Sequence, residues 1–130
     1  MTTGLLPRIA EELQDIVSDC AEAGAAEIAQ EGGQTMIIVP VQAEGWSPPV
    51  VPVLFRVPLL YPDERPDLIY LDAGAHGPSG AIPRAMGAVT FLGRPWTQVS
   101  WHMTGSYDAT RPNLQLFVRS TALYFRSPNP

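Results

Sequence analysis

Two side chains in the last third of the chain, Ser100 and His102, are of the types that carry out nucleophilic acyl transfer. A serine hydroxyl attacks an activated carbonyl only when a base removes its proton, and histidine is the usual base. If the segment around them is extended, residues two apart share one face, so His102 can take the proton of Ser100. Asp72 or Asp108 is a candidate to orient the imidazole, as in a Ser-His-Asp arrangement. The pattern predicts a serine nucleophile.

The same residues also fit a structural role. Ser100 can cap the turn after Trp96, while His102 hydrogen-bonds a backbone carbonyl. A third polar residue, His76, is expected to pin its own loop through a hydrogen bond from side chain to backbone. The sequence leaves the catalytic and the structural interpretation of Ser100 and His102 open.

The elements that must position these groups follow from apolar spacing. Apolar residues recur at three- and four-residue steps from Leu6 to Cys20, which predicts an amphipathic helix. Similar spacing predicts a second helix over 114–125. Short runs rich in β-branched residues predict four strands, which cover residues 25–30, 35–42, 50–57 and 68–71.

Two further features complete the predicted architecture. Pro40 favours a bulge or an edge position for its strand, and Pro52 argues against a central hydrogen-bonded place for the next, since proline has no N–H for a ladder. Residues 73–93 contain five glycines and two prolines, and predict a long ordered loop that includes a short strand at 89–92. We expect one α+β domain over residues 1–130, an antiparallel meander with the first helix on one face.

Composition narrows the function classes. The net charge of −5 argues against a nucleic-acid partner, because phosphate contacts need clustered Lys and Arg. No apolar run approaches the length of a membrane span and the chain shows no leader segment, so we expect no membrane association and a soluble, cytoplasmic protein. One cysteine and two histidines make a metal site improbable, and no cofactor is expected.

A rigid segment precedes the fourth predicted strand. Tyr61-Pro62 and Pro66 fix an extended arm, because proline sets its own φ and restricts the residue before it. This arm looks like the Tyr-Pro-x-x-Pro-Pro arm of the ubiquitin-conjugating enzyme (E2, or UBC) family. His76 stands at the distance from Tyr61 at which that family has His-Pro-Asn.

Other parts of the chain extend the resemblance. Trp96 and the Ser-Pro-Asn-Pro ending at 127–130, close to the family's Asp-Pro-Asn-Pro, carry it over nearly the whole sequence. The resemblance implies a UBC-like fold: an N-terminal helix, a four-stranded antiparallel meander, a long active-site loop and a C-terminal helix. Tyr61, Pro62 and His76 would then support the site and not react.

A more specific likeness lies in residues 91–102. This segment is similar to the Gly-Arg-x-x-Gln-x-Trp-Ser-Arg-His signature of a bacterial E2-like family that occurs beside E1-like adenylating enzymes and ubiquitin-like proteins. Ser100 and His102 match the signature, whereas Val99 and Trp101 depart from it. The resemblance implies an E2-like carrier in a bacterial ubiquitin-like conjugation pathway, of a kind expected in anti-phage defence, with the E1-like enzyme and the ubiquitin-like protein as partners.

The nucleophile departs from the family pattern. Family members carry a cysteine in a Gly-x-x-Cys context, and the nearest equivalent here, Gly87 to Thr90, ends in threonine. We therefore expect an oxyester on Ser100, with Thr90 as the second candidate, in place of a thioester. Two alternatives remain: a non-catalytic UBC-like module that binds or presents a ubiquitin-like protein, and a UBC-like domain outside any conjugation pathway.

Overall fold

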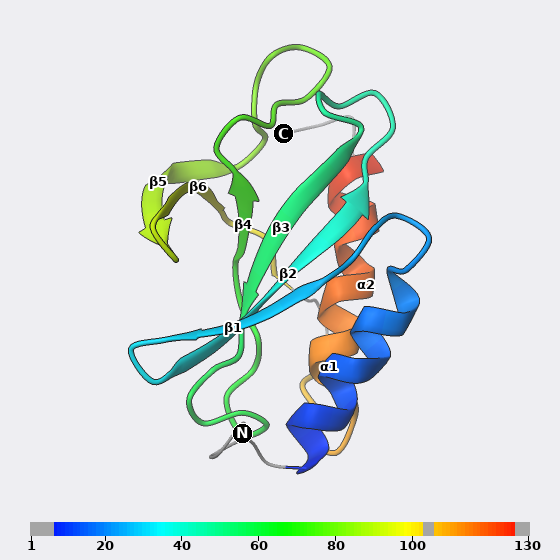
Figure 1. The fold of residues 1–130 in the computed structure, drawn as a ribbon, viewed down its shortest axis with the longest axis vertical. Coiled ribbons are helices and arrows are strands. Elements are labelled where there is room, and N and C mark those ends of the chain that lie inside the picture. The colour runs from blue at the N-terminus through cyan, green and yellow to red at the C-terminus, as the bar shows by residue number, and fades with distance from the viewer. Residues whose placement is uncertain (1–6, 103–105, 127–130) are drawn as a thin grey trace.

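The computed structural model describes residues 7–102 and 106–126, and these ranges contain two helices and six strands (Figure 1). Both helices and the first four strands lie where the apolar spacing predicts them. The elements are α1 (Pro7–Asp19), β1 (Glu27–Glu31), β2 (Gln34–Gln42), β3 (Val50–Arg56), β4 (Ile69–Asp72), β5 (Ala85–Phe91), β6 (Arg94–Val99) and α2 (Asn113–Arg126).

The six strands form one antiparallel sheet in the order β1-β2-β3-β4-β6-β5. The α+β class is confirmed, but the prediction of four strands is wrong. The additional hairpin, β5 and β6, begins inside the segment that we predicted to be a long loop, and β5 includes residues 89–91 of the short strand that we expected at 89–92. All but two β5 residues are exposed, so the strand lacks the apolar alternation that marks a half-buried strand.

A two-residue turn closes this hairpin. Leu92 and Gly93 both have positive φ, +57° and +71°, which is the geometry of a type I′ turn. Leucine is an unusual residue for that position, since a side chain there is sterically strained. The turn was therefore not predicted, because leucine is not a residue type that indicates a type I′ turn.

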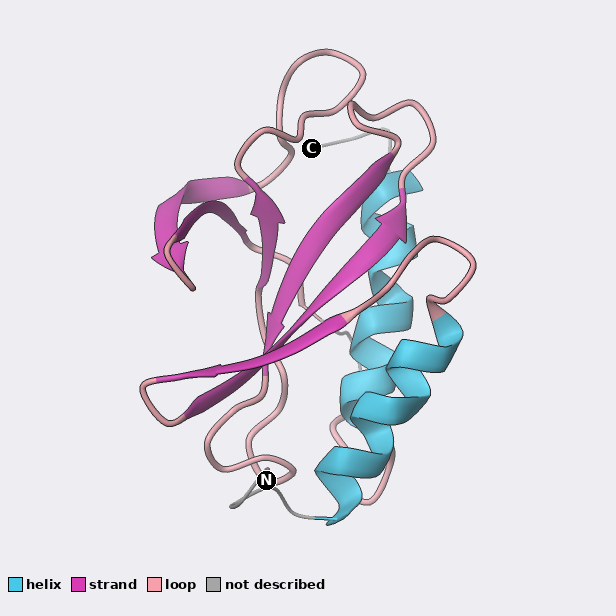
Figure 2. Cartoon of the chain, viewed as in Figure 1, coloured by secondary structure: helices cyan, strands magenta, loops and turns pink. Residues whose placement is uncertain are grey.

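Both helices lie against one face of the sheet (Figure 2). The apolar stripe of α1 packs with that of α2, and both contact the inward residues of the central strands. The core between the layers includes Leu13, Phe55, Leu71, Phe117 and Tyr124, all almost fully buried. This layer is the support from which the functional segments project.

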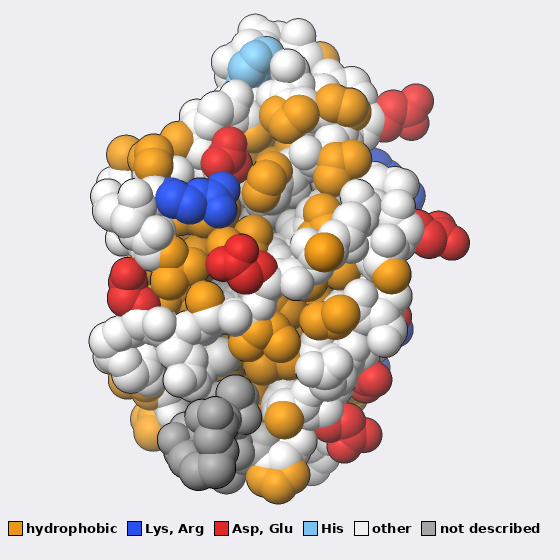
Figure 3. Space-filling view, viewed as in Figure 1, with side chains coloured by type: hydrophobic (Ala, Val, Ile, Leu, Met, Phe, Trp, Pro, Cys, Tyr) orange, Lys and Arg blue, Asp and Glu red, His pale blue; other side chains and the backbone are white. Residues whose placement is uncertain are grey.

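A smaller apolar cluster occupies the opposite face of the sheet. Met36, Ile38, Leu54, Tyr70 and Trp96 form its buried part, and the β5–β6 hairpin curls over it. Figure 3 shows hydrophobic side chains across the middle of this view, with acidic and basic side chains among and around them. The curl explains how a strand as exposed as β5 is held in place.

The two strand prolines do not mark edge strands, contrary to our prediction. β2 and β3 are interior strands, and Pro40 lies directly opposite Pro52. β1 pairs with β2 only up to Ile38, and β4 pairs with β3 only at Val53 and Leu54. Neither proline therefore faces a neighbour that would need its missing N–H.

Some predictions concern residues outside the described ranges. These are the start of the first helix at Leu6 and the Ser-Pro-Asn-Pro ending. Within residues 7–102 and 106–126, no helix is both long and apolar enough to cross a membrane.

Candidate active site

Ser100 and His102 meet immediately after β6. Ser100 Oγ lies 3.0 Å from His102 Nε2, which is hydrogen-bonding distance. The backbone here is folded by a tight turn, in which the Trp101 N–H donates to the Val99 carbonyl at 3.0 Å. The two side chains therefore meet across a turn and not along a straight strand.

The other imidazole nitrogen contacts a carboxylate. His102 Nδ1 makes a short contact with Asp67 Oδ1. In this arrangement Nδ1–H donates to Asp67, which leaves Nε2 free to accept the Ser100 hydroxyl proton. Ser100, His102 and Asp67 thus form a continuous Ser-His-Asp relay, the geometry of an activated serine.

Local backbone geometry sets the direction of Asp67. The next residue, Leu68, has a φ of +61°, a left-handed conformation that is rare for a branched side chain. The Leu68 N–H donates to Asp67 Oδ1 at 3.1 Å, the same oxygen that His102 contacts. Such strained residues cluster at functional sites, where the surrounding structure enforces them. Sequence analysis missed Asp67, because a leucine at position 68 gives no indication that the backbone there is left-handed.

The proline arm carries Asp67 to the histidine. Tyr61 is buried at its start, and its hydroxyl donates to Glu12 Oε2 of α1 at 2.5 Å. The Leu114 N–H, in the first turn of α2, donates to both Glu12 Oε1 and the Tyr61 hydroxyl, each at 3.1 Å. Burial, and then the bond to Glu12, raise the pKa of Tyr61 far above its ordinary value. This buried junction ties the arm to both helices.

Further contacts hold the middle of the arm. The Tyr61-Pro62 peptide is cis, and the Pro62 carbonyl accepts a hydrogen bond from the Tyr107 hydroxyl at 2.6 Å. The Arg65 guanidinium stacks over the Tyr107 ring at 5.2 Å, and Pro66 is buried. Pro62 thus supports the site through the backbone and takes no part in the relay.

The relay is open to solvent. The side chains of His102 and Asp67 are 50% and 52% exposed, and Ser100 is partly buried. The Ser100 N–H is already bonded to the Arg84 carbonyl at 3.0 Å, and the Trp101 N–H to Val99. Neither N–H group is free to stabilise an oxyanion, so these two amides do not form a preformed oxyanion hole.

A cation stands beside the relay. The Arg84 guanidinium lies over the ring of Trp101, the residue that follows Ser100, at 5.8 Å from the ring centre. Arg84 also has a left-handed φ of +59°, so a second strained residue adjoins the site. Arg84 is exposed, and its guanidinium is a group that can approach negative charge on a substrate oxygen.

The two carboxylates that we predicted as partners of His102 have other roles. Asp72 accepts hydrogen bonds from the Arg94 guanidinium and the Gly74 N–H. Asp108 accepts from the side chain and backbone N–H of Thr110, and these bonds lower its pKa. The structure therefore replaces Asp72 and Asp108 with Asp67 as the third group.

The remaining predicted residues lie elsewhere. Thr90 is exposed in β5 opposite Pro95, near the hairpin turn, and about five residues or 16 Å along β6 from Ser100. His76 pairs through its backbone with Ser47, and its Nδ1 lies 3.1 Å from the Gly77 carbonyl. The relay includes neither Thr90 nor His76.

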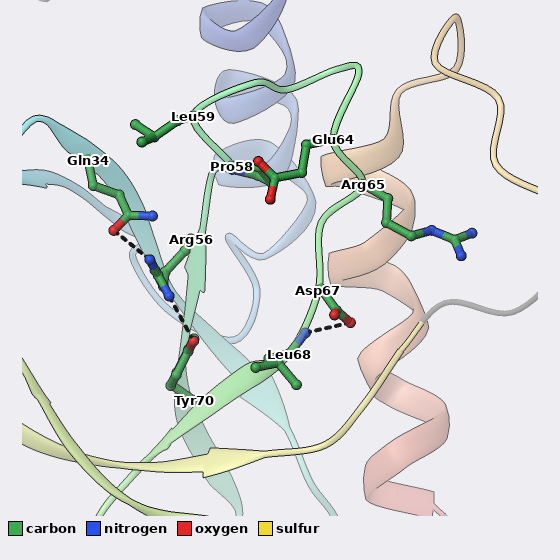
Figure 4. Close-up of a pocket in the computed structure, with 9 residues that line it drawn as sticks. All are labelled: Gln34, Arg56, Pro58, Leu59, Glu64, Arg65, Asp67, Leu68 and Tyr70. Carbon is green, nitrogen blue, oxygen red and sulfur yellow. Dashed lines mark hydrogen bonds between the residues drawn. The ribbon is translucent and has the colours of Figure 1, made fainter.

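A pocket of about 270 Å³ opens behind the arm, beside Asp67 (Figure 4). Arg56 crosses its floor, donating to Gln34 at 2.9 Å and to the Tyr70 hydroxyl at 3.2 Å, while Arg65 points away from it. Neither Ser100 nor His102 lines this pocket. Asp67 does line it, so the pocket adjoins the relay at this carboxylate and lies away from the serine and the histidine.

Comparison with known proteins adds no assignment. No family model, curated protein or solved structure matches the chain. Among the described residues, no group of three or more His, Cys, Asp or Glu side chains is placed to hold a metal ion. The relay is therefore the feature that indicates the chemistry of the site.

Proposed function

We propose that this protein is an E2-like acyl carrier that accepts the C-terminus of a ubiquitin-like protein as an oxyester on Ser100. One observation carries the proposal: Ser100, His102 and Asp67 form a continuous relay from hydroxyl to imidazole to carboxylate. This arrangement activates a serine for attack on a carbonyl. The proposed pathway is bacterial ubiquitin-like conjugation, with a role in anti-phage defence.

The loading step follows from the relay. Ser100 Oγ forms a bond to the carbonyl carbon of a thioester held by an E1-like adenylating enzyme, and its proton passes to His102 Nε2. Asp67 stabilises the resulting imidazolium. The carbon–sulfur bond then breaks, and the departing thiolate takes the proton from His102. An acceptor amine attacks the oxyester in the second step, and Ser100 is regenerated as its hydroxyl.

The order of elements supports a UBC-like scaffold for this chemistry. Helix α1 precedes strands β1 to β4, which pair consecutively as an antiparallel meander and pack one face on α1. The arm at Tyr61 then leads into β4. The β5–β6 hairpin places Ser100 at the end of a strand beside β4, so the proposed nucleophile lies on a different element from the threonine that aligns with the family cysteine.

Two experiments test the proposal. A fluorophosphonate probe reacts with activated serines, so the wild type should be labelled and Ser100→Ala should not. Incubation with the E1-like enzyme, ubiquitin-like protein and ATP should give an adduct that hydroxylamine or alkali cleaves and thiol does not. A wild type that forms no such adduct refutes the carrier function, whereas full loading of Ser100→Ala refutes only the assignment of the nucleophile.

A second function, binding without chemistry, is favoured by the openness of the site. Water reaches both His102 and Asp67, and the Ser100 and Trp101 amides are occupied, so no oxyanion hole is preformed. A UBC-like module that presents a ubiquitin-like protein needs neither feature. The same incubation separates the two functions, because such a module binds the partner and remains unmodified.

A further inference from the structure

The two edges of the sheet differ in chemical character. β1 forms one edge and carries Glu27 and Glu31, both exposed, which discourage another strand from pairing there. β5 forms the other edge with the sequence Ala-Met-Gly-Ala-Val-Thr-Phe, which has no charge and no proline. Met86 within it is 56% exposed. β5 has the properties of an edge that accepts a strand, apart from a bulge near Ala85.

The hairpin geometry shows which β5 groups are available. A two-residue turn makes the pair beside it, Phe91 and Arg94, exchange hydrogen bonds. The next pair, Thr90 and Pro95, then faces away from the ladder, which agrees with the missing N–H of Pro95. Alternation turns the N–H and C=O of Thr90 and Ala88 towards the open edge. An added strand would bond to these two residues.

We infer that β5 is the docking edge for the extended, uncharged C-terminal segment of a partner protein, which pairs antiparallel to β5 and leads its terminus towards Ser100. This inference rests on the proposed function for the identity of the partner. A strand antiparallel to β5 runs towards Ala85, and the adjacent residue Arg84 bonds through its carbonyl to the Ser100 N–H. The docking edge thus ends beside the nucleophile.

The reach is consistent with chain dimensions. A strand added to β5 lies about 5 Å from it and about 10 Å from β6. Each extended residue spans about 3.4 Å, so about three residues beyond Ala85 are enough to reach Ser100. The partner's paired segment and its reacting terminus are therefore contiguous.

Charge also identifies which end of the partner arrives. Arg84 is exposed at the Ala85 end of the edge, and within the described part of the chain it forms no ion pair. The carboxylate of a partner C-terminus that is not yet activated meets this guanidinium where it passes Ala85, and in the thioester the guanidinium faces the carbonyl oxygen instead. In the opposite, parallel orientation the C-terminus would lie at the Phe91 end of β5, away from both Arg84 and Ser100.

Nuclear magnetic resonance with a peptide probe tests the inference. The probe is an acetylated octapeptide of Thr, Val and Ser that ends in glycine, made as the free acid and as the amide. Titrated into ¹⁵N-labelled Ser100→Ala protein, the acid should shift the amides of β5 and slow hydrogen exchange at Ala88 and Thr90. Ala88→Pro should weaken binding about tenfold by removing one outward N–H, and the matched edge variant Gln30→Pro on β1 should not.

Arg84→Gln separates the two parts of the inference. It should weaken the acid about five- to tenfold and leave the amide unchanged, because only the acid carries the carboxylate. Shifts confined to β1, unchanged exchange at Ala88 and Thr90, or a protein dimer that Ala88→Pro dissociates would each overturn docking of a partner strand at β5. Because Ser100→Ala cannot be acylated, these outcomes do not depend on the outcome of the loading experiment.

Discussion

Substitution of Asp67 by asparagine tests the relay most directly. The change keeps the size of the side chain and removes the negative charge next to His102. Since the relay stabilises the imidazolium that forms when Ser100 loses its proton, Asp67→Asn should slow every reaction of Ser100 with an electrophile. The fold should be unaffected, because Asp67 is exposed.

The structure sets the size of the effect. Charge centres about 4 Å apart interact by about 1 kcal/mol in water and about 4 kcal/mol at a protein surface. Both side chains are about half exposed, so the lower part of this range applies. A loss of about 1 to 2 kcal/mol corresponds to a rate lower by about five- to thirtyfold, far less than at a buried triad.

The second-order rate of fluorophosphonate labelling measures this loss. Asp72→Asn is the matched control, since Asp72 pairs with Arg94 and should leave the rate unchanged. The difference between wild type and Asp67→Asn should shrink in 1 M salt, which screens exposed charges. Labelling of Asp67→Asn at the wild-type rate, or equal slowing by Asp72→Asn, would refute the relay.

Three further predictions concern stability, measured by urea unfolding. Tyr61→Phe should lower the free energy of unfolding by about 2 kcal/mol, because it removes a hydrogen bond to the carboxylate of Glu12. Tyr107→Phe removes a hydrogen bond to a neutral carbonyl and should lower it by about 1 kcal/mol. Equal losses for the two variants would contradict the charged hydrogen bond. Burial raises the pKa of Tyr61 and Tyr124, so the unfolded chain loses these two protons at lower pH than the folded chain. Stability should therefore fall as the pH rises above about 10, and the chain has no lysine whose titration would obscure the effect. A stability that stays constant up to about pH 11.5 would contradict this prediction. Gly32→Asn should raise stability by about 0.5 kcal/mol, since Gly32 has a φ of +58° with open space around it and asparagine restricts the unfolded chain; destabilisation would contradict the turn geometry.

Regular elements were predictable where burial leaves an apolar pattern, on one face of a helix or on both faces of a central strand. The stripe of α1 and the apolar runs of β2, β3 and β4 show the spacing that burial requires, so their positions were correct. The β5–β6 hairpin was not predictable in the same way. β5 is exposed on most of its length, and Leu92 occupies a turn position that normally holds asparagine or glycine.

In the candidate site, too, one contact was predictable from the sequence and the other was not. Ser100 and His102 are two residues apart, and local spacing was enough to expect their contact, because a short chain segment can bring together only near neighbours. Asp67 lies 35 residues from His102 and reaches it through a strained residue at Leu68 and an arm anchored at Tyr61. That contact depends on how β4, β6 and the arm pack, and many carboxylates in the sequence were equally eligible. The sequence alone was enough to predict the contact between Ser100 and His102. The tertiary structure was needed to identify Asp67 as the third residue, because long-range contacts depend on packing and not on spacing along the chain.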